Sequence, residues 1–147
     1  MLKNKLIKGV ATAALMFTMV SSVFATVKAG QSKDFYFVFD GVGSIDYTTT
    51  VNKTNTSYVS MKCTNAEIDG SSYTAYVVNR NTGVKSSADY TFYDGTYHLM
   101  ANSIIEDARS RGDYSAQPTR INASCKDDVY GEGAIFEGYW YADSDIY

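Results

Sequence analysis

The alternation of apolar and polar residues at a period of two constrains the fold of this chain more than any other feature. Segment 34–40 places three phenylalanines on one face, and segment 133–142 places Phe136 and Trp140 on one face. Such alternation is typical of strands with one buried and one exposed face. It recurs along most of the chain, with turn residues at short intervals, so the sequence predicts an all-β fold.

Seven or eight short strands follow from this pattern, and they predict a small antiparallel β-sandwich. A small barrel is the alternative architecture. The runs 90–93 and 96–100 are separated by Asp94-Gly95, which is a strong signal for a two-residue hairpin. Segment 44–50 is rich in threonine and predicts one exposed strand.

The alternation stops at segment 102–112. Ser103 followed by Glu106 fits a capping box, in which each of the two side chains accepts a hydrogen bond from the other residue's backbone N–H. This spacing predicts one short helix, with an ordered loop as the alternative.

Residues 1–29 have the layout of an export signal. Basic residues come first, an apolar run covers 9–20, and small residues before Thr26 and Gly30 allow cleavage after Ala25 or Ala29. The apolar run is shorter than the roughly 20 residues that a membrane-spanning helix needs. We therefore expect a signal peptide over 1–29, a single domain over 30–147, and a secreted, extracellular protein with no membrane span after cleavage.

The charge of the chain excludes one class of partner. The whole chain carries a net charge of −3, and several of its lysines lie in the export segment, so the exported part is more acidic still. Such a protein is repelled by phosphate backbones. We expect no nucleic-acid partner.

Cys63 and Cys125 are the two cysteines of the chain, and both lie in the exported part. Strand alternation points both thiols inward, and an even pair in a small exported domain predicts a disulfide. Two separate buried thiols, acting as small apolar side chains, are the alternative.

Residues for catalysis or metal binding are few. His98 is the single histidine, its neighbours Tyr97 and Leu99 are expected to point inward, and no Gly-x-Ser-x-Gly elbow is present. Asp127, Asp128 and Glu132 gather in one loop without the repeating pattern of a calcium loop, so a solvated acidic loop competes with calcium binding. We expect no enzyme activity, no cofactor and no metal site.

Tyrosine is the residue type in excess, with 13 copies. Tyr36, Tyr139 and Tyr141 lie opposite the expected core faces of the first and last strands. Their hydroxyl groups favour contact with water or a partner, so they are candidate binding residues for sugar rings, peptide or an envelope surface. The other interpretation is that tyrosine simply fits half-buried strands.

Two segments carry a resemblance. They are 53–59, Lys-Thr-Asn-Thr-Ser-Tyr-Val, and 138–144, Gly-Tyr-Trp-Tyr-Ala-Asp-Ser. The chain resembles small exported, uncharacterised β-sandwich proteins of Gram-positive bacteria with a similar Lys-Thr-Asn stretch and Gly-x-Trp-x-x-Asp-Ser ending. It is more distantly similar to the lactococcin-type bacteriocins, which act on the envelope of related cells. The resemblance implies no catalytic residues.

These observations lead to three functional hypotheses. The first is a secreted, bacteriocin-like or envelope-contacting binding protein, and the second is a carbohydrate-binding module that binds polysaccharide. The third is a small glycoside hydrolase using Glu137 and a second carboxylate, for which spatial separation of the two groups would decide the mechanism.

Overall fold

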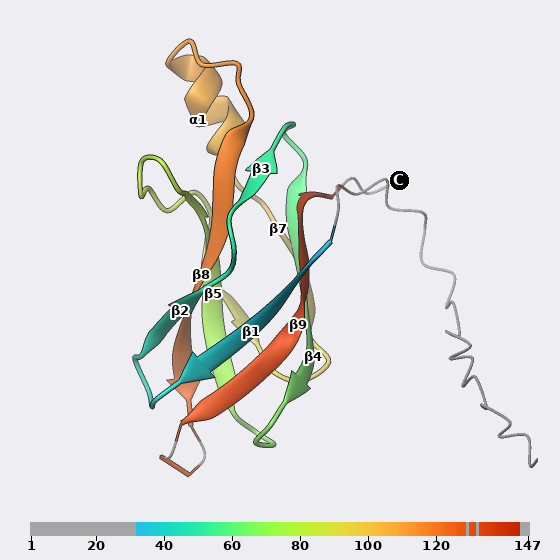
Figure 1. Ribbon diagram of the computed structural model, residues 1–147, viewed down its shortest axis with the longest axis vertical. Helices are drawn as coiled ribbons and strands as arrows, with labels where there is room; N and C mark the ends of the chain where they lie inside the picture. Colours follow the sequence, from blue (N-terminus) through green and yellow to red (C-terminus); the bar gives the residue numbers. More distant parts are fainter. Residues whose placement is uncertain (1–31, 129, 132, 145–147) are drawn as a thin grey trace, which may run out of the picture.

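The computed structural model describes residues 32–128, 130–131 and 133–144, so the expected signal peptide and its cleavage sites lie outside the described residues. Two antiparallel sheets pack face to face, and one short helix lies at one end (Figure 1). The predicted all-β sandwich with a short helix is therefore confirmed.

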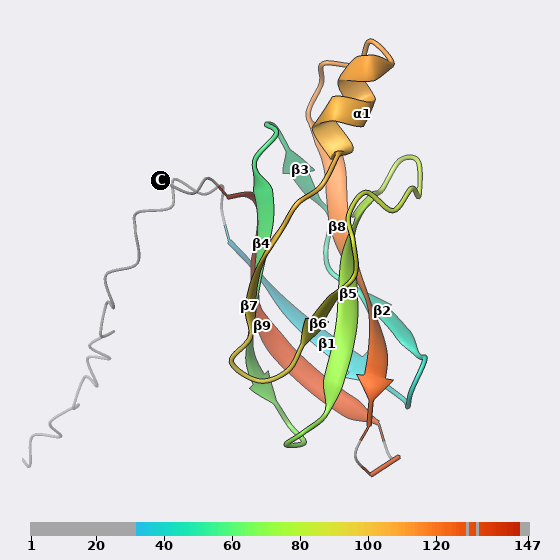
Figure 2. The same ribbon diagram turned by 180° about the vertical axis from the view of Figure 1, so that it is seen from behind.

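The first sheet has the spatial order β1 (Lys33–Phe39), β9 (Ala134–Ser144), β4 (Tyr58–Ala66) and β7 (Tyr97–Met100). The second sheet has the order β2 (Ile45–Tyr47), β8 (Gln117–Asp127), β5 (Ser72–Asn79) and β6 (Tyr90–Phe92), and β3 (Val51–Lys53) also pairs with β8. Helix α1 (Ile104–Ser110) follows β7, and Figure 2 shows it next to the start of β8.

The described residues form nine strands rather than seven or eight, because the expected exposed strand 44–50 is shortened to β2 and an additional short strand, β3, follows that segment. The interruption lies at Thr48. Its backbone N–H donates to the Ile121 carbonyl at 2.9 Å, and its hydroxyl oxygen accepts from the Ile121 N–H at 3.0 Å. A side-chain oxygen thus replaces a backbone carbonyl in the ladder, and β2 and β3 pair with separate parts of β8.

The hairpin predicted at Asp94-Gly95 is wrong. The turn itself forms, with the Thr96 N–H bonded to the Tyr93 carbonyl at 3.0 Å and Gly95 at a φ of 80°. The strands on either side do not pair: β6 pairs with β5 in one sheet, and β7 pairs with β4 in the other. Burial explains the crossing, because Phe92 and Met100 each enter the core from a different sheet.

The core contains the inward faces that the alternation predicted. Phe35, Phe37 and Phe39 are buried along β1, and Trp140 is fully buried on β9. Tyr73 packs among the rings: it stacks on Phe92 at 5.2 Å between ring centroids and meets Phe37 edge-on at 5.4 Å. Stacked and edge-on ring pairs stabilise the fold by more than the apolar area that they bury.

The helix begins where it was expected, but its first turn differs from a capping box. Ser103 is the N-cap residue, and its side chain makes no capping hydrogen bond. Its hydroxyl donates instead to the Asp107 carboxylate at 2.7 Å. Ile104, Ile105 and Ala108 are buried against the sandwich, so tertiary packing holds this short helix.

The predicted disulfide between Cys63 and Cys125 is also wrong, since both thiols are free and buried. Cys63 belongs to β4 in one sheet, whereas Cys125 belongs to β8 in the other. Tyr73 neighbours Cys125 in the β5–β8 register, and its hydroxyl is close to the Cys63 thiol. A large ring therefore fills the core beside both thiols, which act as small apolar side chains. Burial raises the pKa of the Cys63 thiol to about 11, so the thiol stays protonated at neutral pH.

Candidate binding face

The outer face of the first sheet carries the tyrosines that the sequence singled out. Alternation along β9 turns Phe136 and Trp140 into the core and leaves Tyr139 and Tyr141 on the outer side. Alternation along β1 does the same for Tyr36, which is 57% exposed. We use the name tyrosine face for the outer surface formed by Tyr36, Tyr97, Tyr139 and Tyr141.

Strand register brings carboxylates next to these rings. Asp34 lies opposite Tyr139, and Glu137 lies opposite Tyr36, on the paired strands β1 and β9. On the other side of Tyr139, Lys62 of β4 is its partner. Side chains directly opposite each other in an antiparallel pair have Cβ atoms roughly 4.5–5.5 Å apart. Each carboxylate therefore lies beside a tyrosine ring.

Two rings of the tyrosine face contact each other. Tyr139 and Tyr141 meet edge-on, with 5.9 Å between their centroids and 86° between their planes. Partial burial raises the pKa of the Tyr139 hydroxyl, and the nearby hydroxyls of Tyr141 and Tyr97 add to this shift. Tyr97, missed by sequence reasoning, joins the face because β7 turns Met100 inward and Tyr97 outward.

An open cleft of about 460 Å³ lies in this face, lined by Asp34, Phe35, Tyr36, Thr64, Glu137, Gly138 and Tyr139. Gly138 forms part of its wall. A Cβ atom at this position would overlap the Lys62 carbonyl oxygen and lie 2.7 Å from the Phe35 ring. The absence of a side chain at Gly138 therefore lets β9 approach β4 closely. The buried Phe35 ring packs over Gly138 on the core side of the sheet.

A second open cleft, of about 340 Å³, continues along the same strands. Its lining includes Val38 and Ile135, which are a register pair one step beyond Tyr36 and Glu137 on the same face. Asp40 and Glu67 contribute carboxylates to it. The two clefts together follow β1 and β9 rather than forming an enclosed pocket.

The tyrosines on the outside of the second sheet are in a different setting. The Arg120 guanidinium lies 4.4 Å from the centroid of the Tyr47 ring, and the Lys85 amine lies 4.7 Å from that of Tyr76. Cations over ring faces stabilise such pairs and occupy the surface that a ligand would use. In the part of the chain that the structure describes, no cation covers a ring of the tyrosine face.

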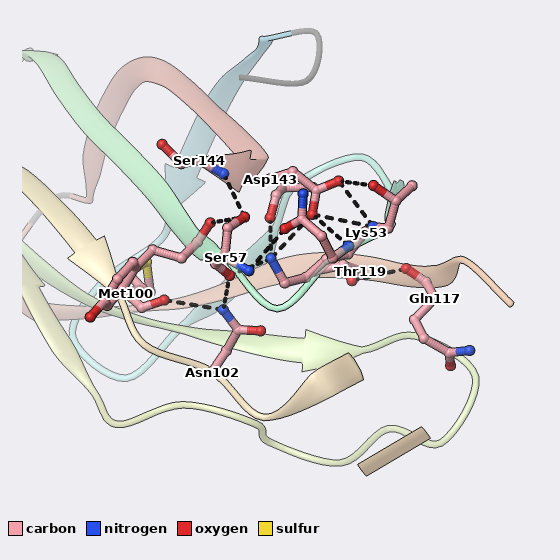
Figure 3. A network of polar contacts seen from close by, with 12 residues as sticks. Lys53, Ser57, Met100, Asn102, Gln117, Thr119, Asp143 and Ser144 are labelled. Carbon is pink, nitrogen blue, oxygen red and sulfur yellow. Dashed lines mark hydrogen bonds and ion pairs between the residues drawn. The ribbon is translucent and has the colours of Figure 1, made fainter. Parts of the chain in front are cut away.

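The two segments that carried the family resemblance meet in one polar network (Figure 3). The fully buried Lys53 amine donates to the carbonyls of Ser57 and Ala142 and forms an ion pair of 3.2 Å with Asp143. Asp143 also accepts from the Thr54 N–H and hydroxyl, at 2.9 and 2.6 Å. These residues therefore hold β3, the start of β4 and the end of β9 together, which is a structural role.

His98 lies between the sheets, not on the surface as expected. Its Nε2 is 2.9 Å from the Thr91 carbonyl oxygen, and its ring meets Phe92 edge-on at 4.9 Å. The expectation failed because Tyr97, His98 and Leu99 offer no clear alternation, and Met100 sets the register instead. No serine, cysteine or carboxylate among the described residues bonds to this histidine, so it lacks the partners of a catalytic triad.

The acidic loop uses its carboxylates internally. Asp128 accepts from the backbone N–H groups of Tyr130, Gly131 and Gly133, at 3.3, 3.0 and 2.7 Å, and Asp127 accepts from the Ser72 hydroxyl. Glu132 lies outside the described residues. Within those that are described, no three metal-ligating side chains come together.

Comparison with known proteins gives a family. The family model described as "Protein of unknown function (DUF2712)" matches residues 21–144, which is most of the chain. No curated protein and no solved structure matches. Over the residues described, no helix has the length and apolar content needed to cross a membrane.

Proposed function

The chain belongs to this family, whose description assigns no activity, and we propose from the tyrosine face that it is a secreted, non-enzymatic protein that binds a glycan of the cell envelope. The observation that carries the proposal is the open cleft bounded by Tyr36 and Tyr139 on the flat outer side of a sheet. Sugar rings have apolar faces and polar edges, which suit exposed aromatic rings beside hydrogen-bonding groups.

Two features favour binding over catalysis. The clefts are open along β1 and β9, which suits a long polymer better than a reaction that must exclude water. The carboxylates of Asp34 and Glu137 make no hydrogen bond or ion pair with another described residue, so nothing orients them for acid or base work. A catalytic group is normally held in place by a second polar group.

Pull-down on purified cell wall and on insoluble polysaccharide tests the proposal. Removing two central aromatic contacts typically weakens binding by about tenfold or more. We expect this loss for Tyr36→Ala/Tyr139→Ala. The matched control, Tyr47→Ala/Tyr76→Ala, removes two tyrosines from the other sheet and should bind as the unmodified protein does. Equal loss in both variants, or no retention by either material, would contradict the proposal.

The same preparations separate the other hypotheses. Release of sugar by the unmodified protein, abolished in Glu137→Gln with folding intact, would assign a glycoside hydrolase instead. Killing of related strains that needs Tyr36 and Tyr139 would extend envelope binding to bacteriocin-like action. Folding of each variant can be followed by the fluorescence of Trp140, the single tryptophan, which is fully buried.

A further inference from the structure

Four carboxylates line the two clefts of the first sheet. Asp34 and Glu137 belong to the first cleft, and Asp40 and Glu67 belong to the second. None of the four forms a hydrogen bond or ion pair with another residue that the structure describes. Other acidic side chains are committed internally, as Asp128 is to backbone N–H groups and Asp143 is to Lys53.

The carboxylates of the first cleft belong to two successive outward-facing rows of paired residues on β1 and β9. Asp34 is opposite Tyr139, and Glu137, two residues before Tyr139 on β9, is opposite Tyr36. Diagonal neighbours in such a pair lie roughly 7–8 Å apart at the backbone, within reach of long side chains. A cation seated between the two rows would therefore meet two carboxylates and the faces of two tyrosine rings. Carboxylates and aromatic faces both attract an ammonium group.

A ligand that covers the clefts removes water from these carboxylates. A neutral sugar gives each of them hydroxyl donors but no opposite charge, whereas a phosphate-rich polymer adds repulsion. Lys62 is the cation of this row, and it lies on the β4 side of Tyr139, away from Asp34 on β1. The β1 side of the tyrosine face therefore presents negative charge and aromatic surface together.

The length of the acidic strip suits a polymer. Asp34 and Asp40 are six residues apart on or directly after β1, which corresponds to roughly 20 Å of extended strand. A small ligand with a single positive charge would occupy only one of the two clefts. A repeating chain with a positive charge on successive units would use both.

We infer that the bound glycan is a polymer of amino sugars with free, protonated amino groups, and that Asp34 and Glu137 hold those groups beside Tyr36 and Tyr139. This inference rests on the proposed function and adds the chemical class of the ligand. The pairs between carboxylates and ammonium groups select amino sugars, while the tyrosine rings make contacts with sugar faces that do not depend on the amino group.

Calorimetric titration with soluble oligomers of equal length tests the inference. The probes are oligomers of glucosamine with free amino groups, the same oligomers fully N-acetylated, and oligolysine. Two charge-assisted hydrogen bonds favour the free amine by roughly tenfold or more over the acetylated form. Higher ionic strength should reduce this preference, because the clefts are open to solvent.

The variant Asp34→Asn/Glu137→Gln should bring the two glycan affinities within about threefold of each other and leave binding of the acetylated oligomer intact. The matched control, Asp89→Asn/Glu106→Gln, removes the same charge from exposed positions that line neither cleft and should keep the preference.

Each unfavourable result has a separate meaning. Tighter or equal binding of the acetylated oligomer by the unmodified protein overturns the inference and leaves the proposed function standing. Oligolysine binding as tightly as the amino glycan overturns it too, because charge alone would then account for the selection. Failure of every oligomer and of the cell-wall pull-down removes the proposed function itself.

Discussion

Replacing Lys53 by methionine tests the buried network that joins the ends of the sandwich. The Lys53 side chain is fully buried and the Asp143 side chain is 12% exposed, so water cannot replace a lost partner. Removing one member of a buried ion pair costs about 3–5 kcal/mol, because the other charge stays buried. Thr54 still donates to Asp143 in the variant, which places the expected loss near the lower end of that range.

Urea unfolding followed by Trp140 fluorescence measures this loss. The matched control is Lys85→Met, which breaks the pair with Asp89. That pair is shorter, at 2.7 Å, but its side chains are 43% and 57% exposed. Exposed pairs contribute about 0–1 kcal/mol, so the control should stay within that range. A milder probe, Thr54→Val, removes the 2.6 Å hydroxyl bond to Asp143 and should cost about 1.5–3 kcal/mol. Equal losses for Lys53→Met and Lys85→Met would refute the reasoning.

Three further measurements address other parts of the molecule. Gly138→Ala should lower the free energy of unfolding, measured in urea, by about 3 kcal/mol or more, because the added Cβ would overlap the backbone of β4. The control Gly95→Ala has open space around the new Cβ but a φ of 80°, so it should lower the free energy of unfolding by only roughly 1–2 kcal/mol. Equal losses in the two variants would contradict this reasoning. Because the pKa of the Cys63 thiol is raised to about 11 in the folded protein, this thiol loses its proton at lower pH in the unfolded chain than in the folded one. The free energy of unfolding should therefore fall as pH rises from about 9 to 11, and it should fall less steeply in Cys63→Ala. Native protein at pH 8 should resist thiol alkylation that proceeds in urea, and rapid native labelling would show that Cys63 and Cys125 are accessible.

The sequence determined which faces are buried. In strands, side-chain direction depends only on parity, so Phe35, Phe37 and Phe39 could be assigned to the core and Tyr36 to the surface without knowing which strands pair. The same parity placed Tyr139 and Tyr141 on the outside and Trp140 on the inside. The predicted binding residues therefore came from local pattern alone, and the structure adds that all three tyrosines lie on one sheet.

Pairing partners needed the tertiary structure. The turn at Asp94-Gly95 has the residues of a hairpin, yet burial of Phe92 and Met100 against different sheets separates its strands. The two cysteines have inward parity, yet parity says nothing of the sheet to which each belongs or of the ring that fills the space beside them. Both errors arise because a local signal does not fix contacts between distant segments.

The candidate site shows the same division. Composition and alternation identified exposed tyrosines, but only strand register placed Asp34 and Glu137 beside them and added Tyr97. The segments 53–59 and 138–144 stand out as motifs in the sequence, but the buried ion pair that they form joins residues 90 positions apart and is visible only in the tertiary structure. Local sequence fixes the direction of a side chain within its own strand, whereas the charge and shape of a face arise from strands that the fold brings together.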